Sequence, residues 1–242
     1  MAQKEVFYKG GSFLISYSLV GEDKKQTIVI LHGWGARKGL MEQVFDGAFK
    51  DFKHCYIDLP GFGNSPIPPF ALNTQDYAEV VKLLLEALGI DNPVILGHSY
   101  GGKVATLLNP RELILLSSAG MPTQKSLPVR TKIACVKFLR RFAFGRKITT
   151  LFRSKDVRGM EEVMYQTFKN IVDEDFTPIF KAVHCPCYIF WGREDLATPL
   201  SCGEEIHKCI KDSKFFVLEG DHFFFLKHGK DIEAMILGRN GL

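Results

Sequence analysis

This chain of 242 residues lacks the sequence features that would direct it into or across a membrane. Its first residues, MAQKEVFYKGG, do not show the basic and then apolar pattern of a secretory signal peptide. No apolar run approaches the ~20 residues that a helix needs to span a bilayer. These absences predict a cytoplasmic protein.

The six cysteines do not form a metal-binding pattern. The nearest approach is Cys185-Pro186-Cys187, a C-x-C sequence without a second pair at the spacing of a zinc site. Outside an oxidising compartment such residues serve as small apolar core residues. We therefore expect reduced, mostly buried thiols, and we expect no metal and no other cofactor.

Acidic residues are missing from one stretch of the chain. Between Lys125 and Lys155 there are ten Lys or Arg residues and no Asp or Glu, although the net charge of the whole chain is only +4. Such a block could recruit an anionic partner, namely an acyl carrier protein, a phosphorylated substrate handle or a lipid head-group surface. A solvated helical face without a partner is the alternative interpretation. Nucleic acid is not expected, because no recognition motif accompanies the charge.

Short β-branched and apolar runs recur along the chain and predict strands. An N-terminal hairpin is expected from Glu5–Tyr8 and Phe13–Leu19 around Gly10-Gly11. Further strands are expected at Thr27–Leu31, His54–Leu59, Pro93–Leu96, Glu112–Leu116, Cys187–Trp191 and Lys214–Leu218. Helical periodicity separates several of them, most clearly at Thr74–Leu88, with Asn73 or Thr74 as N-cap. Alternating strands and helices predict an α/β fold with a mostly parallel, eight-stranded sheet.

One connection is too long for a simple crossover. About 65 residues of helical character separate the sixth strand from the next one, and Arg130–Phe144 and Met160–Val172 are the expected helices within it. We interpret residues 121–183 as a helical cap inserted into a core formed by residues 1–120 and 184–242. Such a cap would cover the carboxyl edge of the sheet, where open α/β sheets bind ligands.

The sequence PVILGHSYGG, residues 93–102, predicts the nucleophile. A G-x-S-x-G match alone is weak, but here a strand precedes it and a helical segment, Lys103–Asn109, follows it. Ser99 would therefore lie at a sharp turn that exposes its hydroxyl. Gly97 and Gly101 would be required because side chains there would collide with the neighbouring strand and helix.

A serine hydroxyl needs a base, and the base needs an acid that orients it. For a nucleophile on this kind of turn, the acid and then the base follow later in the chain. Asp195 follows the expected strand Cys187–Trp191, and His222 follows the strand Lys214–Leu218. Both therefore emerge at the sheet edge where Ser99 emerges, which predicts a Ser99–His222–Asp195 triad.

Several other residues compete for these roles. Glu194 and Asp221 neighbour the chosen acid and base, so an error of one position remains open. His184, His207 and His228 are less well placed than His222, and His98 is expected to pack or hydrogen-bond locally. Asp58 precedes the nucleophile and is expected to fix a turn.

The loop His32-Gly33-Trp34-Gly35 follows the first long strand and predicts an oxyanion hole. Acyl transfer requires backbone N–H groups that stabilise a developing oxyanion. The expected donors are the amides of Trp34 and of Tyr100, the residue after the nucleophile. His32 is interpreted as a residue that supports this loop.

The motifs HGWG, DLPGFGNS, GHSYGG, WGREDLATP and GDHFFF, in this order, resemble those of the α/β-hydrolase fold family. The resemblance covers about residues 12–120 and 184–235. Within the family, a short cap of the four-helix type after the sixth strand resembles two branches: carboxylesterases that act on carrier-linked acyl esters, which likewise carry HGWG, and C–C bond hydrolases of aromatic ring-cleavage products. The second branch often has Trp after the catalytic His, where this chain has Phe223. The cap matches neither branch closely enough for its residues to be assigned.

Three functional hypotheses follow. The first is hydrolysis of a carboxylic ester or thioester through an acyl-serine intermediate. The second is C–C hydrolysis of a 2-hydroxy-6-oxo-dienoate by the same triad. The third is a binding protein that keeps the hydrolase fold without catalysis.

Overall fold

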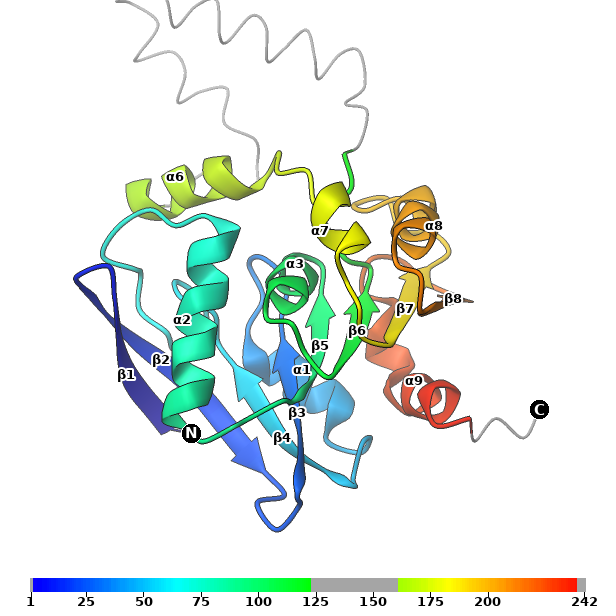
Figure 1. The fold of residues 1–242 in the computed structure, drawn as a ribbon, viewed down its shortest axis with the longest axis horizontal. Coiled ribbons are helices and arrows are strands. Elements are labelled where there is room, and N and C mark those ends of the chain that lie inside the picture. Colours follow the sequence, from blue (N-terminus) through cyan, green and yellow to red (C-terminus); the bar gives the residue numbers. More distant parts are fainter. Residues whose placement is uncertain (1, 123–160, 239–242) are drawn as a thin grey trace, which may run out of the picture.

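The computed structural model describes residues 2–122 and 161–238, and its framework is a single eight-stranded sheet (Figure 1). The strand order is β1-β2-β4-β3-β5-β6-β7-β8, and the pairs from β4 to β8 are parallel. The strands are β1 Ala2–Tyr8, β2 Gly11–Val20, β3 Gln26–Leu31, β4 Phe52–Ile57, β5 Val94–His98, β6 Glu112–Leu116, β7 Cys187–Gly192 and β8 Ser213–Leu218. The predicted mostly parallel α/β sheet is confirmed.

The N-terminal hairpin turns one residue earlier than the sequence predicts. Tyr8 pairs with Gly11, so the turn consists of Lys9 and Gly10, and both have positive φ (48° and 77°). Two consecutive left-handed residues make the tight turn whose twist matches that of antiparallel strands. Gly11 therefore begins β2 instead of closing the turn.

The central strands are buried on both faces, which explains their unbroken apolar sequences. Val29 and Leu31 of β3 face one core cluster and Ile28 and Ile30 face the other. The first cluster is covered by α2, α3, α7 and α8, and the second by α1 and α9 (Figure 1). The 3-10 helix η2 also contributes Phe224 and Phe225 to the second cluster. The helices run α1 Lys38–Phe45, α2 Thr74–Ala87, α3 Tyr100–Leu107, α6 Glu162–Ile171, α7 Thr177–Lys181, α8 Leu200–Cys209, η2 Phe224–Lys227 and α9 Gly229–Ile236.

Helix α2 begins as its sequence predicts. The Asn73 side chain accepts a hydrogen bond from the Asp76 amide, and the Asp76 carboxylate accepts one from the Asn73 amide. This reciprocal capping box pairs donors that the first helical turn leaves without intrahelical partners.

The segment between β6 and β7 is described up to residue 122 and again from residue 161. The bounds of helix α6 agree with those of the expected Met160–Val172 helix to within two residues at each end, and α7 leads into β7 (Figure 1). Arg130–Phe144 and the ten basic residues lie outside the described residues, so the boundaries of the cap remain a prediction. Within residues 2–122 and 161–238, no helix combines the length and apolar character that crossing a bilayer requires.

Candidate active site

Ser99 lies at a strained turn between β5 and α3. Its φ of 52° places a non-glycine residue in the left-handed region, and helix α3 begins at the next residue. The Ser99 amide donates a hydrogen bond to the Leu116 carbonyl (3.0 Å), while the Ser99 carbonyl accepts from the amides of Gly102 and Ala119. These bonds to β6 and α3 hold the turn in a conformation that costs on the order of 1–3 kcal/mol by itself.

The close approach of helix to strand explains the glycines on both sides of Ser99. A Cβ atom added to Gly97 would lie 2.4 Å from the Gly101 carbonyl oxygen, and one added to Gly101 would lie 2.6 Å from the His32 carbonyl oxygen. Both contacts involve backbone atoms, which cannot move aside as a side chain can. The predicted steric reason for these two glycines is therefore confirmed.

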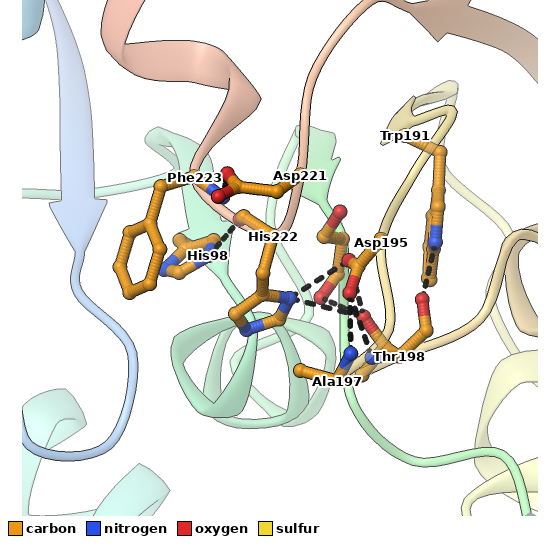
Figure 2. Close-up of polar contacts among 9 residues, drawn as sticks. His98, Trp191, Asp195, Ala197, Thr198, Asp221, His222 and Phe223 are labelled. Carbon is orange, nitrogen blue, oxygen red and sulfur yellow. Dashed lines mark hydrogen bonds and ion pairs between the residues drawn. The ribbon is translucent and has the colours of Figure 1, made fainter.

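Asp195 and His222 meet at the carboxyl edge of the sheet (Figure 2). The Nδ1 atom of His222 lies 2.8 Å from Oδ2 of Asp195, whose side chain is fully buried. Oδ1 of Asp195 accepts hydrogen bonds from the amides of Ala197 and Thr198 (2.8 and 2.9 Å), and the Thr198 hydroxyl donates to Oδ2 (2.8 Å). Both carboxylate oxygens are thus held in place.

These hydrogen bonds determine the charge of Asp195. Burial alone would raise its pKa, but the hydrogen bonds from His222 and Thr198 outweigh burial and lower the pKa to about 2. The ionised carboxylate only accepts hydrogen bonds, so the Nδ1 atom of His222 carries the proton. Nε2 of His222 then carries the free lone pair that a general base requires.

The neighbouring acids are placed differently. Glu194 is exposed, whereas Asp195 is 4% exposed. Asp221 is exposed and accepts from the Phe223 amide. Asp58 binds Lys38 and the Asn64 amide and has no contact with His222. The geometry therefore favours Asp195 as the partner of His222.

The other candidate histidines lie away from Asp195. His184 is exposed, His207 contacts Ser213, and His228 contacts Asp231. His98 is buried and packs against neighbouring rings, as one of the two predicted alternatives required. Its hydrogen bond is not local, because its Nε2 atom lies 3.0 Å from the carbonyl oxygen of His222, 124 residues away.

The loop after β3 is fixed by His32. The Nδ1–H group of His32 donates to the Gly33 carbonyl (2.8 Å), and its Nε2 atom accepts from the Leu59 amide (3.0 Å). The indole of the adjacent Trp34 packs edge-on against Phe62 and Tyr100, with ring centroids 4.7 and 5.5 Å away. The loop is therefore held next to the first turn of α3.

A cavity of about 420 Å³ connects these parts. It is lined by Ser99, His222, Trp34 and Tyr100, whereas Asp195 lies behind His222 and does not reach it. Phe168 and Ile171 of α6 contribute apolar walls, together with Met121 and Ala197. Space beside both the serine and the imidazole can hold a small or medium-sized acyl group.

An ion pair lies at one side of this cavity. The Nζ atom of Lys103 on α3 is 2.6 Å from Oε2 of Glu174, and it also donates to the Ile171 carbonyl (2.8 Å). The Lys103 side chain is 3% exposed, and Glu174 also accepts hydrogen bonds from the amide and hydroxyl of Thr74. Burial lowers the pKa of Lys103, and Glu174 opposes that shift. The pair attaches the α6–α7 connection to the helix that follows Ser99.

We expect Lys103→Met to lower the free energy of unfolding by about 2 kcal/mol, because Glu174 would lose its cation in a largely desolvated site. Urea unfolding measures this change. The exposed Lys169→Met on α6 is the control and should stay within about 0.5 kcal/mol of wild type. Equal stability of the Lys103→Met and Lys169→Met proteins would contradict the expectation.

Two functional features were not found from the sequence. Thr198 contacts both Asp195 and the Nδ1 atom of His222 (3.2 Å), and Lys103 pairs with Glu174 across 71 residues. The sequence offers only two signals for these contacts: a threonine three residues after the acid, and a lysine one helical turn after the nucleophile. Neither signal distinguishes these residues from ordinary surface residues.

Within the described residues, no cluster of His, Cys, Asp or Glu side chains has the arrangement of a metal site. Five cysteines are described, and all are free thiols. Cys202, which is 7% exposed, lines the cavity.

Comparison with known proteins places this fold in a large group. The sequence model described as the alpha/beta hydrolase family matches residues 28–234. The chain is 26% identical to AB hydrolase superfamily protein YisY of Bacillus subtilis, over 87% of this chain and 90% of that protein. It is 25% identical to a pimeloyl-[acyl-carrier protein] methyl ester esterase of Neisseria meningitidis, over 88% and 93%.

Solved structures share the architecture at low sequence identity. An esterase from Exiguobacterium antarcticum superposes with a TM-score of 0.73 at 19% identity, over 94% of this chain and 95% of that one. A variant of the meta-cleavage product hydrolase from Pseudomonas fluorescens IP01 gives a TM-score of 0.71 at 17% identity, over 97% and 96%. These likenesses establish the fold and leave the substrate open.

Proposed function

The chain belongs to the alpha/beta hydrolase family, and from this premise we propose that it cleaves a carboxylic ester or thioester through an acyl intermediate on Ser99. The observation that carries the proposal is the 2.8 Å contact between His222 and the ionised Asp195 beside a cavity that Ser99 also lines. A buried acid, an oriented imidazole and a serine on a strained turn are the three parts that activate a serine nucleophile.

In the proposed reaction, Ser99 Oγ attacks the carbonyl carbon while Nε2 of His222 takes its proton. The negative charge that develops on the carbonyl oxygen is stabilised by the amides of Trp34 and Tyr100. The tetrahedral intermediate then collapses, the bond to the leaving group breaks, and His222 protonates the departing alcohol or thiol. Water then gives a proton to Nε2 of His222 and attacks the acyl carbon, and His222 returns that proton to Ser99 Oγ as the acyl–oxygen bond breaks and the acid is released.

We further propose that the leaving group or the acyl group is attached to an acyl carrier. Relatives named pimeloyl-[acyl-carrier protein] methyl ester esterase support this substrate class. The block of ten basic residues between Lys125 and Lys155, which lies outside the described residues, gives the chain a means to attract an acidic carrier. The cavity of about 420 Å³ is suited to an acyl group of modest length.

The test combines covalent labelling with a panel of substrates. The protein should react once with a fluorophosphonate, and peptide mass spectrometry should locate the label on Ser99. It should hydrolyse p-nitrophenyl esters of short acids, and it should prefer an acyl methyl ester linked to a carrier protein over the same ester without the carrier. A folded protein that is neither labelled nor active on any ester or thioester would refute the proposal. Turnover of a ring-cleavage dienoate alone, followed by loss of its visible absorbance, would identify C–C hydrolysis instead.

A further inference from the structure

His98 occupies the end of β5, directly before Ser99, and contacts the segment that carries the base (Figure 2). Its imidazole is 1% exposed, and its Nε2–H group donates to the backbone carbonyl of His222 (3.0 Å). The His98 ring also packs against His222, Phe223 and Phe225, with centroids 4.7, 5.4 and 4.6 Å away. One side chain thus connects the backbone beside the nucleophile to the backbone of the base.

The other side of the His98 ring meets the loop after β3. A Cβ atom added to Gly33 would lie 2.8 Å from Nδ1 of His98 and 3.1 Å from Cβ of Ser99. The Nδ1 atom has no hydrogen-bond partner among the described residues. The imidazole therefore fills the space between Gly33, which precedes Trp34, and the turn that carries His222.

His98 cannot itself exchange protons during turnover near neutral pH. Burial and, to a lesser extent, the neighbouring His222 lower the pKa of His98 to about 3, although the carbonyl of His222 and the charge of Asp195 oppose the shift. The ring is neutral, and its single N–H group is committed to the carbonyl of His222. Any contribution of His98 to the reaction must therefore come from where it holds other groups.

We propose that His98 is a positioning residue that fixes the backbone of His222 relative to Ser99, a role that rests on the proposed function. His222 lies in the connection between β8 and η2, both of its chain neighbours are exposed, and its own backbone carbonyl accepts the hydrogen bond from His98. The hydrogen bond from His98 restrains the turn from the residue adjacent to the nucleophile. A displacement of about 1 Å between reacting groups can reduce a rate by about 100-fold, so a small movement of the turn is sufficient.

The test compares two replacements of His98. His98→Met keeps the volume and removes the donor, and we expect kcat per active site to fall by about 10- to 100-fold while KM changes less than about threefold. His98→Gln places an amide N–H near the position of Nε2 and should recover kcat to within about fivefold of wild type. Active sites are counted by fluorophosphonate titration, so misfolded molecules do not contribute to kcat.

His54→Met is the matched control for loss of a buried imidazole. His54 is also buried and hydrogen-bonded, to Tyr56 and to the Phe49 carbonyl, but it lies on β4 away from the cavity. The His54→Met substitution should lower the melting temperature and leave kcat per active site unchanged. A merely structural role of His98 would give the same result for His98→Met.

The outcomes separate this inference from the proposed function. If the wild type turns over substrate and His98→Met has the same kcat per active site, the proposed role of His98 is overturned and the proposed function is not. A His98→Gln protein as slow as His98→Met also overturns it, because the donor would then be irrelevant. If His98→Met does not fold, His98→Asn replaces it, since its amide is too short to reach the same carbonyl. A folded wild-type protein without turnover or label refutes the proposed function, and the inference with it.

Discussion

The Ser99→Ala protein should hydrolyse esters about 10⁶-fold more slowly than wild type, with KM changed only a few-fold. The hydroxyl oxygen is the atom that forms the bond to the acyl carbon, and no other group on the cavity wall occupies the turn between β5 and α3. Residual turnover would come from the oxyanion hole and from substrate binding. Initial rates at saturating substrate, together with the loss of fluorophosphonate labelling, measure the effect.

Ser118 offers a matched control for this substitution. It is a second serine that lines the same cavity, and it is buried, but its hydroxyl donates to the Ala119 carbonyl (2.9 Å) and not to His222. Ser118→Ala should retain turnover within about tenfold of wild type and should still be labelled at Ser99. Equal losses in the two variants would assign the effect to the shape of the cavity and would remove Ser99 from the mechanism.

The fold was predictable because its strands are buried on both faces. Ile28, Val29, Ile30 and Leu31 alternate between two cores, so an unbroken apolar run was the expected sequence of β3. The same logic located the strand ends at which the candidate residues emerge. Parallel strands place their carboxyl ends on one edge, and position in the sequence therefore predicted position in space for Ser99, Asp195 and His222.

The supporting contacts were not predictable, because they join residues whose own sequence surroundings are ordinary. His98 donates to a carbonyl 124 residues away in the chain, and Lys103 pairs with Glu174, which lies in the loop between α6 and α7. Periodicity describes which face of an element is buried and carries no information on which polar atoms meet there. The hairpin turn lies at Lys9-Gly10 and not at the expected Gly10-Gly11 for a related reason. The register of β1 against β2 decides which residues take the left-handed positions of the turn.

Asp195→Asn should lower kcat by about 10⁴-fold while the protein stays folded. An asparagine amide at this position can donate to Nδ1 of His222, which an ionised carboxylate cannot do. The imidazole proton would then move to Nε2, and His222 could no longer accept the proton of Ser99. The exposed neighbour Glu194→Gln is the control and should keep kcat within about twofold, because Glu194 lies outside this hydrogen-bond network.

The same variant also has a predicted pH signature in stability. The pKa of Asp195 in the folded protein, about 2, lies below its ordinary value of 3.8, so its carboxylate stabilises the fold above about pH 4. That stabilisation, about 2 kcal/mol from the size of the shift, is lost as the pH falls towards 2. Wild type should therefore be more stable than Asp195→Asn at neutral pH, and the difference should shrink between pH 4 and 2 in urea unfolding. A difference that stays constant across this range would show that the carboxylate is not ionised by its contacts with His222 and Thr198, and the assignment of the proton to Nδ1 would fail with it.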